Sequence, residues 1–319
     1  MILQRYCYRA GKLKPNSITP RKEYILATFT TYNQIGRAED VSDIITTITP
    51  SDTPMYTMFK SEKVHNRTFS YLEDSLRAAA SNAKVEGATQ SDITLGNPTE
   101  RTGTCQIISE TFKISETSDA VKLYGRAKET AYQMGRTLKN IKRDVEYAFC
   151  GASNAAAAGD ASTAREMASI DQLISTTLDQ GANATDALTE AKLLTLGQTC
   201  YANGSDPSVF MIKPADAQIV SAFAAASGRN REFAQTKSLV NAIDLYVSPY
   251  GEYKVVLNRH QMTTHAFLID PAMFKTCVLR PFARTLLAKV GDADSHSITG
   301  EMSLKHNSFA DSGMITGLS

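Results

Sequence analysis

A long stretch of helical periodicity between Val121 and Phe149 constrains the fold of this chain more than any other feature. Apolar or small side chains recur in it at alternating spacings of three and four residues, and no proline interrupts them. They are Tyr124, Ala127, Ala131, Met134, Leu138, Ile141, Val145 and Ala148. This spacing predicts one amphipathic helix over 121–149, roughly 42 Å long at about 1.5 Å per residue, with its N-cap at Ser118 or Asp119.

The predicted helix has an apolar side and a basic side. We expect Met134, Leu138, Ile141 and Val145 to form the core of the domain, because their spacing places them on one helix face. The other faces carry mostly basic side chains, which we expect to be solvated. They are Lys122, Arg126, Lys128, Arg136, Lys139, Lys142 and Arg143. A helix this long is predicted to act as a spine that spans its domain.

Composition is that of an ordinary folded protein, with 42% hydrophobic and 21% charged residues in 319. The sequence contains no apolar run near the length of a membrane span, and its first residues do not form the apolar core of a secretory signal. The five cysteines are scattered without a C-x-x-C pair, which predicts reduced thiols in a cytoplasmic setting.

Charge is unevenly placed along the chain. Residues 1–27 contain six basic side chains and one acidic one, a balance of +5, and residues 28–319 therefore have a balance of −4. An acidic body of this kind argues against general nucleic-acid binding, which requires a basic excess. The basic segment 1–27 could tether DNA or an acidic protein. We favour the alternative that it is absent or disordered in the functional particle, because no periodic apolar pattern could bury it.

The order of patterns along the chain predicts an α+β protein in five segments. Residues 1–60 form an extended N-terminal arm with a short helix near Glu39–Ile48, and residues 61–115 form a β-hairpin. Residues 116–184 contain the spine helix, residues 185–274 form an α/β block, and residues 275–319 are strands that return to pack on the spine.

The hairpin is unusual because some thirty polar residues separate its two β-like runs, Thr68–Glu73 and Gly103–Lys113. So long a tip on a two-stranded hairpin predicts either a segment that becomes ordered against a neighbouring subunit or a mobile surface loop. If the tip contacts a neighbour, we expect the contact at Arg77, Lys84, Glu86 and Gly87.

The second half of the chain alternates segments with helical and with strand-like patterns. Helices are predicted over Ile170–Leu178, Thr185–Ala202 and Pro214–Ala226. Strands are predicted over Ser208–Ile212, Leu245–Val247, Tyr253–Leu257, Thr276–Leu279, Thr285–Val290 and Ser297–Leu304.

Motifs that would indicate catalysis or a cofactor do not occur. The sequence lacks both glycine-rich phosphate-binding motifs, G-x-G-x-x-G and G-x-x-x-x-G-K-[ST]. It also lacks the H-E-x-x-H zinc motif and the G-x-S-x-G motif of serine hydrolases. The segment Asp292–His296 starts like a calcium loop but lacks its glycine and final glutamate, so we interpret it as a polar turn. His260 and His265 have no cysteine or carboxylate at ligand spacing, and ordinary surface or core histidines are the better interpretation. We therefore predict no enzyme activity, no metal and no cofactor.

Nine short segments occur along the chain in an order shared with a known protein family. They are Arg37–Ile45, Thr49–Pro54, Val85–Ala88, Cys105–Ile107, Ala131–Gln133, Lys142–Glu146, Ala164–Met167, Leu279–Phe282 and Leu287–Asp292. In their order these segments resemble the tailed-bacteriophage major capsid proteins of the Hong Kong 97 fold. Within that class they resemble a capsid family of short-tailed phages once known only as a domain of unknown function, and the resemblance covers residues 29–319.

The resemblance implies a shell protein that self-assembles as hexamers and pentamers into an icosahedral head enclosing double-stranded DNA, without sequence-specific binding and without a membrane. In the vocabulary of that fold, the hairpin would be the E-loop, the spine helix would belong to the P-domain, and the α/β block would be the A-domain. A portal protein and a separate scaffolding protein are implied partners, and assembly would occur in the host cytoplasm before the subunit resides in the virion. Two alternatives stay open: a nanocompartment shell protein of the same fold, and a soluble enzyme with a site near 259–267.

Overall fold

The computed structural model describes residues 52–87, 89, 95–122, 128–179, 186–226 and 245–318. The predictions for residues 1–51, including the short helix near Glu39–Ile48 and the basic segment 1–27, lie outside the described residues. Among the described residues, no helix combines the length and apolarity needed to span a lipid bilayer.

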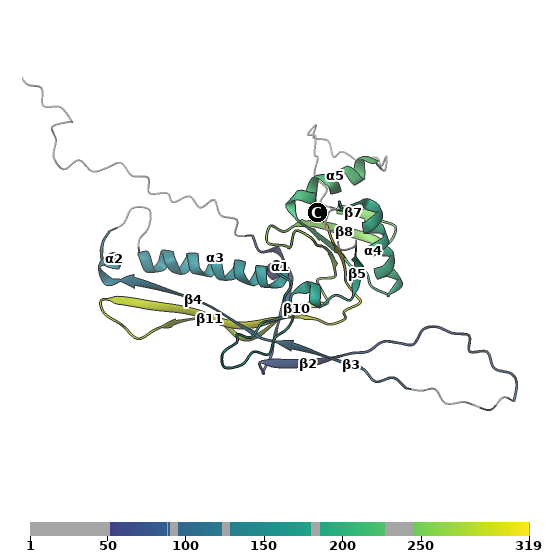
Figure 1. Ribbon diagram of the computed structural model, residues 1–319, viewed down its shortest axis with the longest axis horizontal. Helices are drawn as coiled ribbons and strands as arrows, with labels where there is room; N and C mark the ends of the chain where they lie inside the picture. Colours follow the sequence, from purple (N-terminus) through teal and green to yellow (C-terminus); the bar gives the residue numbers. More distant parts are fainter. Residues whose placement is uncertain are drawn as a thin grey trace, which may run out of the picture. The chain divides into compact units, whose positions relative to one another are not determined.

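Four strands far apart in sequence form one sheet in the order β1-β10-β11-β4 (Figure 1). They are β1 (Lys60–Lys63), β10 (Phe274–Leu286), β11 (Ala293–His306) and β4 (Gln106–Ser115). β1 runs parallel to β10, and the other neighbours are antiparallel. Pro281 lies where the register of β10 against β11 shifts, because a proline has no N–H to donate to the ladder.

The long helix lies along this sheet and is shorter than predicted. α3 spans Glu129–Cys150, and residues 121, 122 and 128 are not helical, so the prediction of a helix from Val121 is wrong. A separate short helix, α2 (Glu116–Ala120), comes first, and its Asp119 accepts a hydrogen bond from the N–H of Thr130 at 3.1 Å. Asp119 therefore caps α3 from the preceding helix rather than from within a continuous one.

Only part of the predicted apolar stripe faces the core. Ile141 and Val145 are buried against β4 and β11, and Met134 is half-buried against the same cluster. Leu138 is 40% exposed, so its prediction as a core residue is wrong for the subunit. The buried side of the helix is centred on Thr137, Ile141, Val145 and Ala148, and Leu138 lies at its edge. Thr137 is buried in place of Leu138.

This difference predicts unequal costs for two truncations on one helix. Ile141→Ala should lower the free energy of unfolding by about 2–5 kcal/mol, because it leaves a cavity between helix and sheet. Leu138→Ala should cost less than about 1 kcal/mol in the subunit, because the side chain already meets solvent. Urea unfolding of both purified variants measures this, and a larger loss for Leu138→Ala would refute the assigned face.

A second, six-stranded sheet has the order β5-β12-β9-β6-β8-β7. Its strands are β5 (Thr176–Asp179), β12 (Gly313–Thr316), β9 (Ala266–Ile269), β6 (Val209–Ile212), β8 (Gly251–Leu257) and β7 (Leu245–Ser248). The helices α4 (Glu190–Ala202) and α5 (Ala217–Ala226) pack on it, the latter after the short 3-10 turn η3 (Pro214–Asp216). Buried side chains of α4, β6, β8 and β9 form its core.

Most of the predicted elements in this half are confirmed, with four differences. The strand predicted over Thr285–Val290 is the last part of β10, which ends at Leu286, and residues 287–290 are not in a strand. Ile170–Leu178 is not a helix but a 3-10 turn, η2 (Ile170–Gln172), followed by β5. The second predicted helix begins at Glu190, with Thr189 as its cap, rather than at Thr185. β12 joins the six-stranded sheet, so the expectation that residues 275–319 all return to the long helix is wrong for residues 313–316.

His306, at the end of β11, is fully buried next to Phe274 of β10. Its Nδ1 donates to the carbonyl of Leu173 at 2.8 Å, and its ring stacks on Phe274 with centroids 4.0 Å apart. Burial lowers the pKa of His306 to about 4. The native state therefore requires a neutral imidazole.

The lowered pKa predicts a loss of stability in acid. Neutral His306 contributes its full share of stability above pH 6.5. As pH falls from 6.5 toward 4, the unfolded chain gains a proton that the folded protein does not take up, and the free energy of unfolding decreases by about 3 kcal/mol in total. The difference in unfolding free energy between the wild type and His306→Gln, measured from pH 7.5 to 4, should shrink with falling pH. A difference independent of pH would contradict the assignment.

Candidate functional site

The exposed tip of the hairpin is the first candidate site. β2 (Thr68–Glu73) pairs antiparallel with β3 (Thr99–Thr104), and residues 74–98 connect them. The described residues of this tip form neither helix nor strand, and all of them are exposed. Figure 1 draws the tip as a long open loop that continues from the two strands. The second predicted run, Gly103–Lys113, is mostly β4, so β3 rather than this run is the partner of β2.

The predicted contact residues lie together on this tip. Arg77, Lys84, Glu86 and Gly87 are all exposed, and Arg77 Nη1 donates a local hydrogen bond to the carbonyl of Ala78 at 3.1 Å. Gly87 has a φ of 78° in a turn with Glu86, a conformation that disfavours any side chain. Their contact with a neighbouring subunit stays a prediction.

Three apolar side chains of the tip were missed by the sequence reasoning. Leu76, Val85 and Leu95 are 99%, 81% and 82% exposed. Apolar side chains that stand singly are common on protein surfaces, so their exposure alone does not identify a contact. Their signal in the sequence was present but weak, because each stands alone among polar residues.

The base of the hairpin, unlike its tip, is fastened to the rest of the subunit. Glu73 pairs with Arg101 at 2.8 Å and accepts a hydrogen bond from the N–H of Phe309 at 2.9 Å. The guanidinium of Arg101 lies 4.2 Å from the centre of the Phe309 ring, and Lys305 lies over Tyr71. These contacts fix where the tip begins without contacting the tip itself.

A buried carboxylate joins three separate segments of the subunit. Glu146 of α3 is 0% exposed and accepts hydrogen bonds from the N–H groups of Met55 and Tyr56 at 3.0 and 2.8 Å. It also accepts one from Asn258, which follows β8, at 2.6 Å. Met55 and Tyr56 belong to α1 (Pro54–Met58), so Glu146 caps the helix at the end of the N-terminal arm.

The environment of Glu146 opposes its charge. Burial raises its pKa above the ordinary value, although the three donated hydrogen bonds act in the other direction. The charged carboxylate therefore costs solvation, and its contribution to stability decreases as pH rises through its raised pKa, opposite in sign to that of His306. This geometry positions the arm rather than a reactant.

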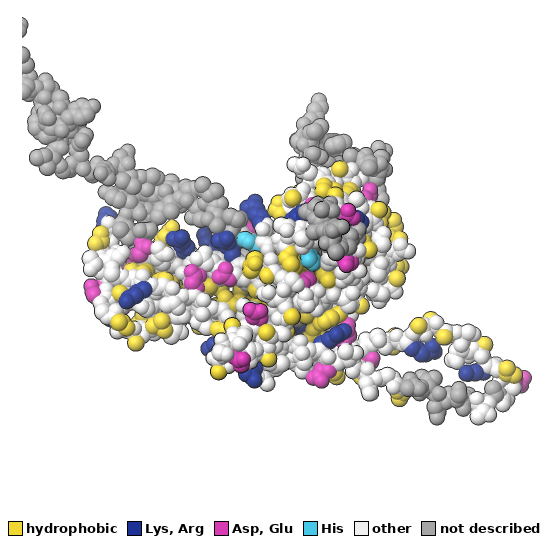
Figure 2. All heavy atoms as spheres, viewed as in Figure 1, with side chains coloured by type: hydrophobic (Ala, Val, Ile, Leu, Met, Phe, Trp, Pro, Cys, Tyr) yellow, Lys and Arg dark blue, Asp and Glu magenta, His cyan; other side chains and the backbone are white. Residues whose placement is uncertain are grey.

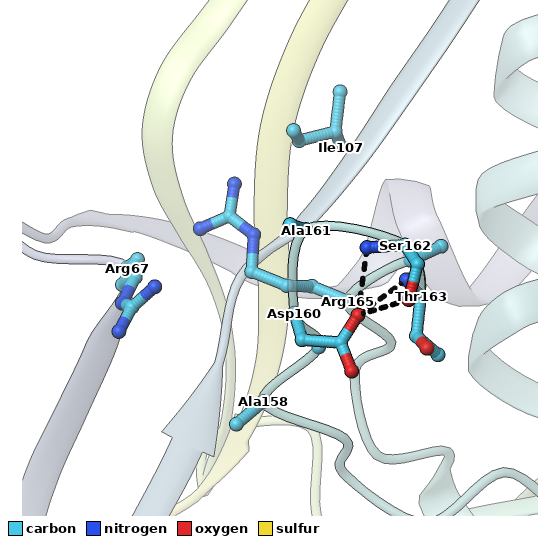
Figure 3. A pocket seen from close by; sticks show the side chains of 10 residues that line it. Arg67, Ile107, Ala158, Asp160, Ala161, Ser162, Thr163 and Arg165 are labelled. Atoms are coloured by element: carbon cyan, nitrogen blue, oxygen red, sulfur yellow. Dashed lines mark hydrogen bonds between the residues drawn. The ribbon is translucent and has the colours of Figure 1, made fainter.

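A pocket of about 560 Å³ lies beside β4, lined by Arg67, Ile107 and residues 158–165. Figure 3 shows Asp160 turned toward Ser162 and Thr163 of its own loop. Hydrogen bonds from the Ser162 N–H and hydroxyl and the Thr163 N–H lower the pKa of Asp160 to about 2. The Ser162 hydroxyl is held by its hydrogen bond to Asp160 at 2.8 Å, and no histidine is among the residues that line this pocket.

His260 and His265, near which the alternative enzyme site was predicted, lie in the loop between β8 and β9. This loop contacts the C-terminal end of α3. Met262 donates its N–H to the carbonyl of Cys150 at 2.9 Å, and His265 Nδ1 lies 2.8 Å from the hydroxyl of Thr264. Burial lowers the pKa of both His260 and His265. Across the described part of the chain, His, Cys, Asp and Glu side chains do not gather in any group able to hold a metal ion.

Comparison with known proteins identifies a family. The model of the family described as "SU10 major capsid protein" matches residues 25–319. The major capsid protein of Escherichia phage Phieco32 is 26% identical over an alignment that covers 90% of this chain and 96% of that protein.

Solved structures share the fold at low identity. The capsid of Cyanophage A-1(L) superposes with a TM-score of 0.69 at 11% identity, covering 91% of this chain and 98% of that one. An encapsulin of Synechococcus elongatus gives a TM-score of 0.57 at 10% identity, covering 89% and 92%. Both have the Hong Kong 97-like α+β capsid fold, which is the fold of this chain.

Proposed function

Because this chain belongs to the SU10 major capsid protein family, we propose that its copies join as hexamers and pentamers into an icosahedral head that encloses double-stranded DNA. The protein is a major capsid protein that forms the shell of a phage head, and it acts structurally rather than as an enzyme. Its place is therefore the virion.

The observation that carries the proposed geometry is the exposed tip on an anchored base. We assign residues 74–98 to the E-loop tip, which laps a neighbouring subunit and covers Leu76, Val85 and Leu95 there. Arg77, Lys84 and Glu86 supply charged contacts at the edge of that interface, and such rim contacts set register more than affinity. The fastened base supports this assignment, because it holds the tip in place while leaving it free for a partner.

The remaining segments are assigned by their packing. α3 with the four-stranded sheet forms the P-domain, and the six-stranded sheet with α4 and α5 forms the A-domain. Residues 1–60 form the N-arm, fastened to the P-domain at its end by Glu146. The strands β5 and β12 belong to the A-domain in this proposal, although they lie outside residues 185–274.

Partners of the shell follow from the family. A portal protein and a separate scaffolding protein belong to the proposal, and the packaged DNA is held without sequence-specific contacts. A nanocompartment shell shares the fold, but a likeness at 10% identity concerns the fold alone, whereas the family match extends over residues 25–319. No observation favours the enzyme alternative.

Electron microscopy of the full chain, expressed with and without the products of neighbouring genes, tests the proposal. We expect closed icosahedral particles when the scaffolding and portal proteins are present. Small monodisperse particles under all conditions, with a saturable small-molecule ligand, would refute it.

A further inference from the structure

One side of α3, opposite its buried face, is occupied by basic side chains. Arg136, Lys139 and Arg143 are spaced three and four residues apart, and Lys142 stands beside them, so all four share this side. We call these four residues the α3 basic face. Arg136, Lys139 and Lys142 are exposed, and none of the four forms an ion pair with a described residue.

The described part of α3 has three acidic side chains. Glu146 lies four residues from Lys142 and three from Arg143 and so shares their side, but its carboxylate is buried against α1. Glu129 is also buried, and the exposed Asp144 lies three residues from Ile141, on the side nearer the core. Figure 2 shows dark blue Lys and Arg side chains along α3, with a histidine nearby and magenta Asp and Glu side chains beside them. The face extends over about 10 Å of helix at about 1.5 Å per residue.

Two nitrogen atoms at the end of this face lack partners. Arg143 Nε and His260 Nε2 are both buried, and neither has a hydrogen-bond partner among the described residues. Three charged side chains lie close enough to His260 to act on its imidazole: the cations Arg143 and Arg259 and the carboxylate of Asp52, so the cations outnumber the anion there by two to one. Buried polar atoms are normally satisfied, so unpartnered nitrogens beside two guanidinium groups indicate a place that an anion occupies.

We propose that the α3 basic face, with Arg259 and His260, binds the phosphate backbone of the double-stranded DNA enclosed by the shell. This inference rests on the proposed function, because it requires a shell that contains DNA. Arginine guanidinium groups match phosphate oxygens in bidentate geometry, and lysines act as point charges. The contact reads no bases, since a helix side contacting phosphates alone carries no sequence information.

Composition favours nucleic acid over an acidic protein as the occupant. Protein interfaces are depleted in lysine and enriched in aromatic side chains at their centre. Between Arg136 and Arg143 the helix has no aromatic residue, and two of its exposed side chains are lysines. A row of charges without an apolar centre suits a polyanion that is held by charge alone.

The small size of the face agrees with the acidic body of the chain. Each phosphate contact makes the slope of log affinity against log salt concentration more negative by about 0.9. A face of four to six basic side chains therefore gives weak, salt-sensitive binding per subunit, which restrains the genome without trapping it.

Binding of labelled duplexes to the full-length subunit tests the proposal. Two unrelated sequences of about 30 base pairs would be titrated at salt concentrations from about 50 to 200 mM. Lys139→Glu with Lys142→Glu should weaken binding about tenfold or more and reduce the slope against log salt by about two, equally for both sequences. The matched control is Lys113→Glu with Lys254→Glu, which makes the same charge change at exposed positions on β4 and β8.

Equal losses of DNA affinity in the test and control variants would overturn the proposal, because net charge alone would then explain binding. Displacement of the duplex by polyglutamate at equal charge concentration would overturn it in favour of an acidic protein partner. Electron microscopy of the same variants separates this inference from the proposed function: normal shells with unchanged DNA binding refute the inference alone, and a wild type that forms no shells refutes the function.

Discussion

Replacement of Glu146 by alanine should lower the free energy of unfolding by about 3–6 kcal/mol. The change leaves the N–H groups of Met55 and Tyr56 and the amide of Asn258 without their acceptor, and Met55 and Asn258 are fully buried. Each buried donor left unpaired costs about 1–3 kcal/mol. The desolvation that raises the pKa of Glu146 does not reduce this loss, because removing one member of a buried network exposes the others to an apolar environment.

Urea unfolding measures the free energy, and limited proteolysis near residues 52–59 detects release of the arm from the subunit. Asp144→Ala is the matched control, since Asp144 lies two residues away on the same helix and is exposed. Glu146→Gln should be intermediate, because its amide keeps one acceptor oxygen and turns a donor toward a donor. An Asp144→Ala variant as unstable as Glu146→Ala would show that Glu146 does not hold the arm.

Deletion of Leu76–Thr94 with a short glycine linker should leave a folded, soluble subunit that no longer closes into shells. The deleted residues that the structure describes contribute no buried side chain, and Glu73 and Arg101 still fasten the hairpin base. The unfolding free energy should therefore change by less than about 1 kcal/mol. Electron microscopy and sedimentation would report the loss of closed particles.

A second variant distinguishes contact from length. Changing Leu76, Val85 and Leu95 to serine keeps the tip at full length and removes its exposed apolar side chains. We expect this variant to assemble poorly, because the covered apolar area supplies the affinity of the contact. Closed particles of normal size from the deletion variant would end the interpretation of the tip as an intersubunit clamp.

Local pattern predicted those elements whose own side chains determine them. α4, β6, α5 and the β7–β8 hairpin were confirmed, because their apolar spacing and turn residues act over a few positions. The helix predicted over Ile170–Leu178 was wrong because its β-branched Thr176 and Thr177 pair with β12, which is distant in sequence. Leu138 was wrong because periodicity identifies a stripe but not which part of it meets the sheet.

The candidate sites divide in the same way. The length and polarity of residues 74–98 predicted an exposed tip, because a loop with few and scattered apolar residues cannot pack on its own domain. The role of Glu146 could not be predicted, since a glutamate in a helix pattern normally indicates a solvated position. Its partners, Met55 and Asn258, are brought to it only by the tertiary fold.

The pairing of β5 with β12 has a consequence in time. Thr176 lies opposite Gly313, and β12 stands between β5 and β9, so β5 has no place in the sheet until β12 has been made. At about 5–20 residues per second, the ribosome takes roughly ten seconds to cover that distance. Once β9 has been made, its edge toward β12 stays open to pairing with other nascent chains until β12 follows, about 2–9 seconds later at the same rate. The yield of correctly folded subunits therefore depends on the rate of synthesis as well as on the stability of the finished fold.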